Sequence, residues 1–325
     1  MITAGIIGGT GYVAGELIRS LLIHPEVNID FVYSHSNPEK PIGIFHQDLA
    51  GISTLHFTDK VNPEVDVVFL CLGHGNSSKF LSENEFSERT VVIDLSNDFR
   101  LTGNAQHGNR NFVYGLPEFQ SHTIRTAKNI ANPGCFATAI QLALLPLAEA
   151  GLLQNEVHVN ATTGATGAGA SLSATTHFAW RQDNLSVYKA FNHQHLGEIN
   201  QTLSTLAGGE IGEVNFLPQR GNFTRGIFAT AYTKADMDEG ALVKLYKDFY
   251  KNAPFTHVQD QDIHLKQVVN TNHCFVQPRV VGNKVFVTSI IDNLLKGAAG
   301  QAIQNMNLVF EWEETTGLHF KANYF

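Results

Sequence analysis

Short apolar segments alternate with amphipathic segments along the first part of the chain, and no other feature constrains its fold as strongly. The strand-like segment Ile2–Ile7 precedes a helical pattern that ends near residue 24, and a second helical pattern covers residues 77–86. Because the strand-like segments are apolar throughout, helices are expected to cover both faces of their sheet. This order predicts a doubly wound parallel α/β sheet with right-handed crossovers. The remaining expected strands are Ile29–Tyr33, Val65–Leu72 and Val91–Leu95.

The second part of the chain has a different texture. After Cys135 a buried helix is expected to continue until Pro146 bends or stops it. Many of the later strand-like segments are β-branched and alternating, which favours a mixed or antiparallel sheet. A helical pattern at Asp238–Lys251 accompanies these segments, so a second, α+β domain is predicted. A last helix is expected at about Lys296–Phe310. The expected strands are Val157–Thr162, Val214–Leu217, Ile227–Thr233, Cys274–Val281 and Lys284–Ile291.

Composition argues against several classes of partner. The 325 residues carry a formal net charge of −8, and Lys and Arg form no dense runs, which disfavours nucleic acid and anionic membranes. No apolar run reaches the roughly 18 residues of a membrane span, and the N-terminus lacks the basic region of a signal peptide. The three cysteines (Cys71, Cys135 and Cys274) include no CxxC pair. This pattern fits a reducing compartment and predicts no metal site.

A glycine-rich turn follows the first strand and opens the first helix. Its pattern, Gly8-x-x-Gly11-x-x-Ala14, lies in the strand–turn–helix context that a dinucleotide fingerprint requires. The glycines let a pyrophosphate approach the backbone, and the helix N-terminus supplies N–H donors. We therefore expect this turn, with Thr10 and Tyr12, to bind a dinucleotide; the alternative is a glycine-rich turn without a ligand.

The tip of the second strand indicates which dinucleotide is bound. An NAD site has an acidic residue there for the ribose 2′-hydroxyl, whereas this chain offers Ser34, His35 and Ser36, with Lys40 nearby. Hydroxyl groups and cations suit a 2′-phosphate better, so NADP is predicted. Alternatively, Ser34 and Ser36 only cap the following segment.

The segment Asn132-Pro133-Gly134-Cys135 predicts a reactive thiol. Asn132 is a favourable helix N-cap and Pro133 is favourable at the first helical position. Cys135 would then lie in the first turn, where the positive end of the helix dipole lowers the pKa of a thiol. The sequence therefore predicts a nucleophilic cysteine. The alternative is a small buried side chain, which is the usual role of a cysteine.

Histidines and arginines supply candidate partners for this thiol. His193 and His195 stand in a polar stretch before a helical pattern and could provide a base, or could be solvated loop residues. Arginine is scarce, and Arg100, Arg220 and Arg225 each lie near a strand end or a turn. Each could bind phosphate or carboxylate bidentately, or could pair with a surface carboxylate.

The whole chain resembles the N-acyl-γ-glutamyl-phosphate reductase family, the arginine-pathway relatives of aspartate-semialdehyde dehydrogenase. Three departures from the family pattern are Ala14, Phe136-Ala137 and Gln194, none of which removes a reacting group. The matching motifs run in order along the chain: Gly8-x-x-Gly11-Tyr12, Asp94-Leu95-Ser96-Asn97-Asp98-Phe99-Arg100-Leu101, Tyr114-Gly115-Leu116-Pro117-Glu118, Asn132-Pro133-Gly134-Cys135, Thr163-Gly164, Gly167-Ala168-Gly169, His193-Gln194-His195 with Glu198-Ile199, Thr224-Arg225-Gly226, Asp292-Asn293-Leu294 and Lys296-Gly297-Ala298-Ala299-Gly300-Gln301.

This resemblance implies a Rossmann domain of residues 1–133 with 293–325, around a catalytic and oligomerisation domain of residues 134–292. It implies NADPH as cofactor, a cytoplasmic homodimer or homotetramer, and a small acyl-phosphate substrate. It assigns the nucleophile to Cys135 and the acid/base role to His195. The expected substrate-binding residues are Arg100, for the departing phosphate, and Asn132, His193, Tyr188, Arg220 and Arg225. The expected cofactor-binding residues are Gly8, Thr10, Gly11, Tyr12, Ser34, Ser36, Asn293 and Gly297.

The expected reaction is reduction of an N-acyl-γ-glutamyl phosphate to the semialdehyde through a thioester on Cys135. Acetyl is the default acyl group, with succinyl or a carrier-linked amino group as variations within the family. The alternatives are aspartate-semialdehyde dehydrogenase, a Cys–His hydrolase or acyl transferase, and a non-enzymatic NADP-binding redox regulator.

Overall fold

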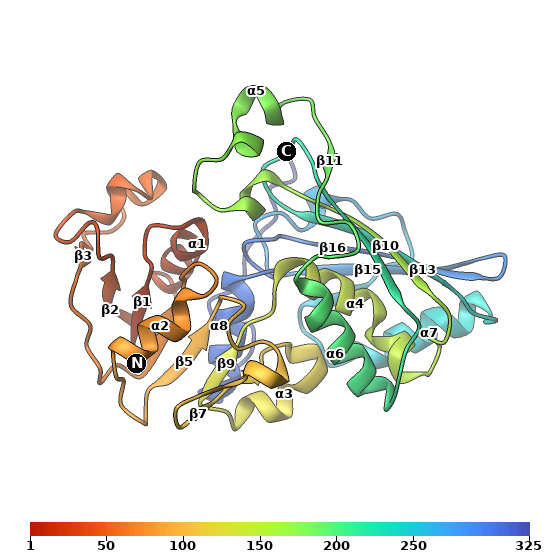
Figure 1. Ribbon diagram of the computed structural model, residues 1–325, viewed down its shortest axis with the longest axis horizontal. Coiled ribbons are helices and arrows are strands. Elements are labelled where there is room, and N and C mark those ends of the chain that lie inside the picture. The colour runs from red at the N-terminus through yellow and green to blue at the C-terminus, as the bar shows by residue number, and fades with distance from the viewer. The chain divides into compact units, whose positions relative to one another are not determined.

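A computed structural model describes residues 1–325, which form two compact units. The first unit contains Met1–Pro133 and Ala298–His319, and the second contains Gly134–Gly297 and Phe320–Phe325 (Figure 1). The C-terminal part of the chain therefore contributes to both units. No helix combines the length and the apolar composition that a membrane span needs.

The first unit is built on a seven-stranded sheet in which every pairing is parallel. The strand order is β3-β2-β1-β4-β5-β9-β8, so the chain winds outward in both directions from β1 and β4. The predicted doubly wound parallel sheet is thus confirmed. Its strands are β1 (Ile2–Ile7), β2 (Val27–Tyr33), β3 (Phe57–Thr58), β4 (Val67–Leu70), β5 (Val91–Asp94), β8 (Val113–Tyr114) and β9 (Asn129–Ala131), and β6 (Gln106–His107) with β7 (Arg110–Asn111) form a separate ribbon.

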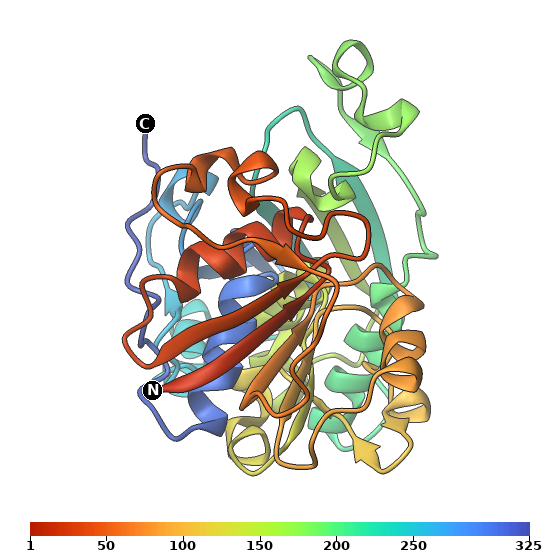
Figure 2. The ribbon, with the colours of Figure 1, turned by 90° about the vertical axis from the view of Figure 1, so that its left-hand side faces the viewer.

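Helices cover both faces of this sheet (Figure 2). Helices α1 and α8 pack together on one face, and α2 lies on the other. Phe80 and Leu81 of α2 join an apolar cluster with Val68 and Leu70 of β4, which explains why the strands carry apolar residues throughout. The helices of the unit are α1 (Tyr12–Leu21), α2 (Asn76–Glu83), α3 (Pro117–Arg125) and α8 (Ala299–Val309).

The second unit contains a mixed seven-stranded sheet, as predicted, in the order β11-β12-β10-β13-β16-β15-β14. Along β10 and β13, buried residues alternate with more exposed ones, so one sheet face is covered and the other is open. Helix α4 packs against the covered face. The strands are β10 (Val157–Thr163), β11 (Ser186–Val187), β12 (Val214–Arg220), β13 (Ile227–Lys234), β14 (Thr256–Val258), β15 (Cys274–Val281) and β16 (Lys284–Ile291), and the helices are α4 (Cys135–Glu149), α5 (Phe178–Arg181), α6 (His195–Ala207) and α7 (Glu239–Phe249).

Helix α4 continues through Pro146 as far as Glu149, so this residue does not stop the helix. Proline lacks the N–H that would donate to the carbonyl of Leu142. The hydroxyl of Tyr250 donates to that carbonyl instead, at 2.6 Å. The hydroxyl of Tyr246 donates to the next carbonyl, that of Ala143, at 2.5 Å. Tyr250, directly after α7, therefore replaces the hydrogen bond that the proline removes, and Tyr246 adds a hydrogen bond to the neighbouring carbonyl.

Candidate active site

In the first unit, the glycine-rich turn joins β1 to α1 at the point where the strand order reverses. Gly8 has φ +81°, and a Cβ there would lie 2.7 Å from the carbonyl oxygen of Cys71. Gly11 is the N-cap of α1 and faces open space, and no side chain caps the helix. The turn thus leaves its backbone uncovered in front of a helix N-terminus, which fits a dinucleotide pyrophosphate. Thr10 is half-buried and Tyr12 is exposed in the same turn.

The tip after β2 fits the phosphate-bearing end of such a ligand. Ser34 is buried and Ser36 is exposed. Asn37 donates to the hydroxyl of Ser34 at 3.5 Å, and Lys40 donates to the amide oxygen of Asn37 at 3.0 Å. This network connects the Lys40 ammonium group through Asn37 to the hydroxyl of Ser34. The tip therefore combines hydroxyl groups with a cation, which is the chemistry that a 2′-phosphate requires.

The loop after β5 holds Arg100, whose side chain is 5% exposed. Its Nε donates to the carbonyl of Asn132 at 2.8 Å and its Nη2 to the carbonyl of Leu95 at 3.0 Å. Asp94, at the end of β5, accepts hydrogen bonds from the hydroxyls of Ser77 and Ser96. Burial raises the pKa of Asp94 to about 6, against the opposing effect of these hydrogen bonds and of Arg100. Arg100 thus joins the loop after β5 to the end of β9.

Asn132 does not cap helix α4, which corrects the prediction. The N-cap of α4 is Gly134, and Cys135 is the first helical residue. The Asn132 side chain is fully buried in the first unit, where it donates to the carbonyl of Ala298 at 3.1 Å and accepts from Asn305 at 3.0 Å. Because both ends of its amide have these partners, it is directed away from a capping role.

In the second unit, Cys135 opens α4 and is half-buried, between two glycines. A Cβ on Gly134 would lie 2.3 Å from the Nε2 atom of His195, so only a glycine allows the imidazole to approach this closely. A Cβ on Gly297 would lie 2.8 Å from the Cβ atom of Cys135. The chain thus brings its predicted acid/base residue against the residue that precedes its predicted nucleophile. The position of Cys135 at a helix N-terminus favours the thiolate form.

Glu198 links these groups and was not singled out as a site residue by the sequence analysis. Its side chain is 2% exposed, and its Oε2 atom accepts a hydrogen bond from the Gly134 N–H at 2.9 Å. Its Oε1 atom lies 3.9 Å from Nε2 of His195. Gln141 of α4 also donates to the Glu198 carbonyl at 3.0 Å. A single buried carboxylate therefore faces the imidazole and holds the start of α4.

His193 lies beside His195, with ring centroids 4.6 Å apart. Its Nδ1 atom accepts from the His195 N–H at 3.2 Å. Phe136 and Phe216 pack against His193 at 5.5 Å each, and Tyr188 packs against it at 5.7 Å. His193 is thus a buried ring that supports the start of α6, and the alternative of solvated loop histidines does not describe either residue.

The two predicted arginines of the second unit have different environments. Arg225 forms a bidentate pair with the buried Asp292, at 3.0 Å and 3.1 Å. Arg220 lies over the ring of Tyr188, with its Cζ atom 4.8 Å from the ring centroid. Burial raises the pKa of Tyr188 to about 12, with a further contribution from Cys135. Tyr188 is therefore a neutral hydroxyl close to both Arg220 and the thiol.

Asn293 is buried within the second unit. Its amide oxygen accepts from the N–H of Gly226 at 2.7 Å, and its amide nitrogen donates to the hydroxyl of Thr166 at 3.0 Å. The loop from Asp292 to Gly297 is therefore fixed from both sides, by Asn293 and by the pair with Arg225. This loop carries Gly297 to its place beside Cys135.

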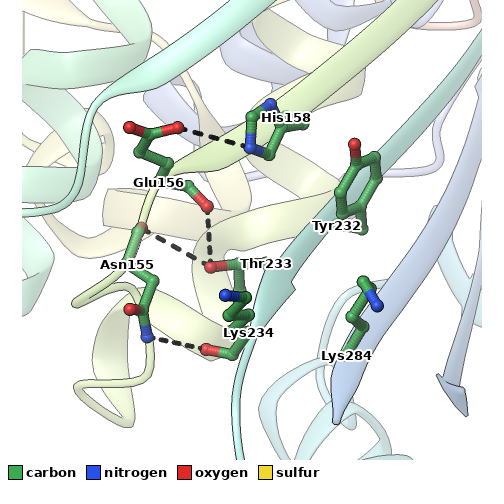
Figure 3. A pocket seen from close by; sticks show the side chains of 7 residues that line it. All are labelled: Asn155, Glu156, His158, Tyr232, Thr233, Lys234 and Lys284. Atoms are coloured by element: carbon green, nitrogen blue, oxygen red, sulfur yellow. Dashed lines mark hydrogen bonds and ion pairs between the residues drawn. The ribbon is translucent and has the colours of Figure 1, made fainter. Parts of the chain in front are cut away.

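The second unit also contains cavities away from Cys135. One of about 360 Å³ lies at the open face of the sheet, lined by side chains that include His158 and Tyr232 (Figure 3). A second, of about 220 Å³, shares these two residues. No predicted site residue lines either cavity, because α4 packs on the opposite face. No group of three or more His, Cys, Asp or Glu side chains is arranged to hold a metal ion.

Two further supporting contacts were not predicted from the sequence. His46 lies behind the glycine-rich turn, with its Nε2 atom 2.7 Å from the carbonyl oxygen of Gly9 and its ring against Gly15. Arg181 ends α5 and donates to the carbonyl of Arg220 at 2.9 Å. Both contacts join segments about 40 residues apart, and nothing in the local sequence signals them.

Both units match known families. Residues 3–127 match the family described as "Semialdehyde dehydrogenase, NAD binding domain", and residues 135–293 match "Semialdehyde dehydrogenase, dimerisation domain". Among solved structures, aspartate semialdehyde dehydrogenase II of Vibrio cholerae superposes with a TM-score of 0.74, over 96% of this chain and 98% of that one. A Candida albicans aspartate semialdehyde dehydrogenase with NADP superposes with a TM-score of 0.66, over 95% and 98%. Identities of 17% and 16% establish the shared fold alone.

Curated relatives are much closer in sequence. The N-acetyl-gamma-glutamyl-phosphate reductase of Christiangramia forsetii is 60% identical over 325 residues, which is all of both chains. The protein of the same name from Flavobacterium johnsoniae is 59% identical over the same full length. The predicted resemblance is therefore confirmed, and the chain belongs to the N-acetyl-γ-glutamyl-phosphate reductase family.

Proposed function

We propose that this enzyme reduces an N-acyl-γ-glutamyl phosphate, by default the N-acetyl form, to the semialdehyde and phosphate, with NADPH as the reductant. The observation that carries the proposal is the convergence of Cys135, Gly134, His195 and Glu198 at the start of α4. Identity of 60% over the full length to a reductase of this name supports the substrate class over that of aspartate-semialdehyde dehydrogenase.

The first half of the reaction builds a thioester. The Cys135 thiolate attacks the γ-carbonyl carbon, the C–S bond forms, and the C–O bond to phosphate breaks. Negative charge that develops on the carbonyl oxygen lies at the N-terminus of α4, where the Cys135 N–H and the helix dipole stabilise it. Arg100 is the residue that we assign to the departing phosphate, because its guanidinium carries a permanent positive charge that suits a phosphate.

The second half releases the aldehyde. NADPH, when bound, supplies the hydride that reduces the thioester carbon. The residues that would hold it are Gly8, Thr10, Gly11 and Tyr12 at the pyrophosphate, and Ser34, Ser36 and Lys40 at the 2′-phosphate. His195 moves the proton as the hemithioacetal at Cys135 breaks and the sulfur leaves. Glu198 faces the imidazole and stabilises its protonated form during this transfer.

Replacing the nucleophile tests this proposal. With Cys135→Ala, we expect no reduction of N-acetyl-γ-glutamyl phosphate and unchanged binding of NADPH, measured by fluorescence titration. Mass spectrometry of the wild type incubated with substrate alone should show the added acyl group on Cys135. The matched control is Cys274→Ala, since Cys274 is buried in β15. Near-normal turnover by Cys135→Ala would refute the mechanism. Faster reduction of aspartyl phosphate than of the N-acylglutamyl substrate would favour the aspartate enzyme.

We also propose that the enzyme is a cytoplasmic homodimer or homotetramer. The free state of all three cysteines supports a reducing compartment. The match of residues 135–293 to a dimerisation domain supports self-association. The open sheet face is the surface that we assign to the partner copy, because His158 and Tyr232 stack there at 4.9 Å while Tyr232 remains 37% exposed (Figure 3).

Analytical ultracentrifugation tests the assembly. Tyr232→Glu places a charge in the centre of this face and should lower the sedimentation coefficient towards that of the 35.7 kDa monomer. Lys251→Glu, on the exposed segment after α7, is the control that should leave assembly unchanged. An oligomer of unchanged stability in Tyr232→Glu would show that another surface holds the copies together.

A further inference from the structure

Two arginine side chains meet at the edge of the second sheet. Arg181 ends α5 and Arg220 ends β12, and Ser186 of β11 pairs with Arg220 across the strands. The Nη1 atom of Arg181 donates to the carbonyl of Arg220 at 2.9 Å, and its Nη2 donates to the hydroxyl of Ser186 at 3.2 Å. Arg181 is 6% exposed, so its guanidinium is held in a fixed position rather than moving in solvent.

Neither guanidinium has a carboxylate partner. No ion pair joins Arg181 or Arg220 to an Asp or Glu, and the buried Nε atom of each has no hydrogen-bond partner. Burial and the charge of Arg220 both lower the pKa of Arg181. Arg225 of the same unit, in contrast, has a bidentate carboxylate in Asp292. Arg181 is buried and Arg220 is half-buried. Because holding two like charges together without a counter-ion is costly, an external anion would stabilise this arrangement.

Ring contacts lead from these arginines to the reacting groups. Arg220 lies over Tyr188 at 4.8 Å, and the ring of Tyr188 is 5.7 Å from that of His193. His193 in turn lies 4.6 Å from His195. Tyr188 remains neutral at any physiological pH, because burial raises its pKa to about 12. It therefore adds a hydroxyl donor between the two cations and the thiol.

We propose that Arg181 and Arg220, with the hydroxyl of Tyr188, form a subsite that binds a carboxylate of the substrate. This inference rests on the proposed function, which makes that substrate an N-acylated glutamyl phosphate. Such a molecule offers a carboxylate from one of two sources. One is the α-carboxylate of the glutamyl group, and the other is a terminal carboxylate on a dicarboxylic N-acyl group such as succinyl. Arg181 thereby becomes a residue that selects the substrate.

Steady-state kinetics of Arg181→Gln and Arg220→Gln test the subsite, with N-acetyl- and N-succinyl-γ-glutamyl phosphate as the two substrates. Loss of a charged hydrogen bond to a carboxylate should raise KM about 10- to 100-fold and leave kcat within about threefold. Arg279→Gln is the matched control, because Arg279 lies on β15 and pairs at 2.6 Å with the exposed Asp262. Arg220→Lys keeps the charge without the planar fork and should have an intermediate KM.

The two sources give different patterns. An equal rise in KM for both substrates assigns the α-carboxylate to the arginines, whereas a rise confined to the N-succinyl substrate assigns the acyl carboxylate. A KM within twofold of wild type for both substrates in Arg181→Gln and Arg220→Gln overturns the subsite alone. Absence of NADPH-dependent turnover of either substrate by the wild type overturns the proposed function, and the subsite with it. If Arg181→Gln fails to fold, Arg220→Gln and Arg220→Lys decide the question.

Discussion

A methyl group at position 134 provides a sharp test of the active-site geometry. In Gly134→Ala the new Cβ would lie 2.3 Å, 2.6 Å and 2.7 Å from three atoms of the His195 ring. Optimal contact between carbon and its neighbours is about 3.5 Å, so the imidazole must move by roughly 1 Å. The backbone of Gly134 has φ −72° and ψ 151°, which alanine adopts without strain. The substitution therefore displaces His195 and leaves the fold in place.

The expected consequence is a fall in kcat of about 100-fold, because a misplacement of about 1 Å costs roughly that factor. The KM for substrate should change little, since the role that we propose for His195 is proton transfer and not substrate binding. The assay is the initial rate of NADPH oxidation with N-acetyl-γ-glutamyl phosphate, together with the thermal unfolding midpoint. The control is Gly209→Ala, where a Cβ meets no atom within 4 Å and φ is not positive.

Two outcomes would contradict this reasoning. If Gly134→Ala keeps more than about a third of the wild-type kcat, the close approach of His195 to Gly134 has no catalytic importance. If kcat falls only in proportion to a lowered unfolding midpoint, the loss reflects stability rather than geometry. The rate of Cys135 alkylation by iodoacetamide separates a displaced base from a displaced nucleophile, because only the latter changes accessibility of the sulfur.

Three other substitutions probe single contacts. Glu198→Gln should lower kcat about tenfold with an unchanged unfolding midpoint, because the amide still accepts from Gly134 but no longer carries a charge opposite the imidazole. Asp94 ionises in the folded state only near pH 6, above its ordinary value of 3.8, so its ionisation destabilises the fold as pH rises between them. Asp94→Asn should remove a decline of about 3 kcal/mol in unfolding free energy across that interval, measured by urea titration. Tyr250→Phe should lower the free energy of unfolding by about 1–3 kcal/mol, because the Leu142 carbonyl loses the hydroxyl that donates to it in place of the N–H that Pro146 lacks.

The parallel sheet of the first unit was predictable because local signals agree. Apolar strands, a glycine-rich turn and an amphipathic α1 all point to the same arrangement within about 20 residues. The continuation of α4 through Pro146 was not predictable, because the hydroxyl that replaces its missing hydrogen bond comes from Tyr250, 108 residues from its acceptor. The rule that proline disrupts a helix considers only the hydrogen bonds within that helix, so it cannot anticipate a donor so far along the chain.

In the candidate site, too, features that depend on local sequence were predictable and features that depend on distant residues were not. The position of Cys135 at a helix N-terminus follows from local sequence, and so does a polar segment around His195. The cap itself was misassigned because the side chain of Asn132 is occupied by Asn305, 173 residues later in the sequence. Arg181 was missed because an arginine at the end of a four-residue helix has no local signal of the role that we propose for it. Its importance comes from the charge of Arg220 beside it and from the lack of a carboxylate.

The two glycines beside Cys135 show why the rest of the site geometry could not be predicted from the sequence. In a sequence, a glycine indicates either a special backbone angle or the need for space, and Gly134 and Gly297 have no positive φ. Both positions lack a Cβ because a neighbouring side chain occupies that space. At Gly134 the neighbour is the ring of His195, and at Gly297 it is Cys135. Cys135, the proposed nucleophile, thus lies beside two positions where a side chain would collide with His195 or with Cys135 itself. That pattern of missing Cβ atoms defines the geometry of the site as strongly as the reactive side chains do, and it depends on segments more than 60 residues apart in the chain.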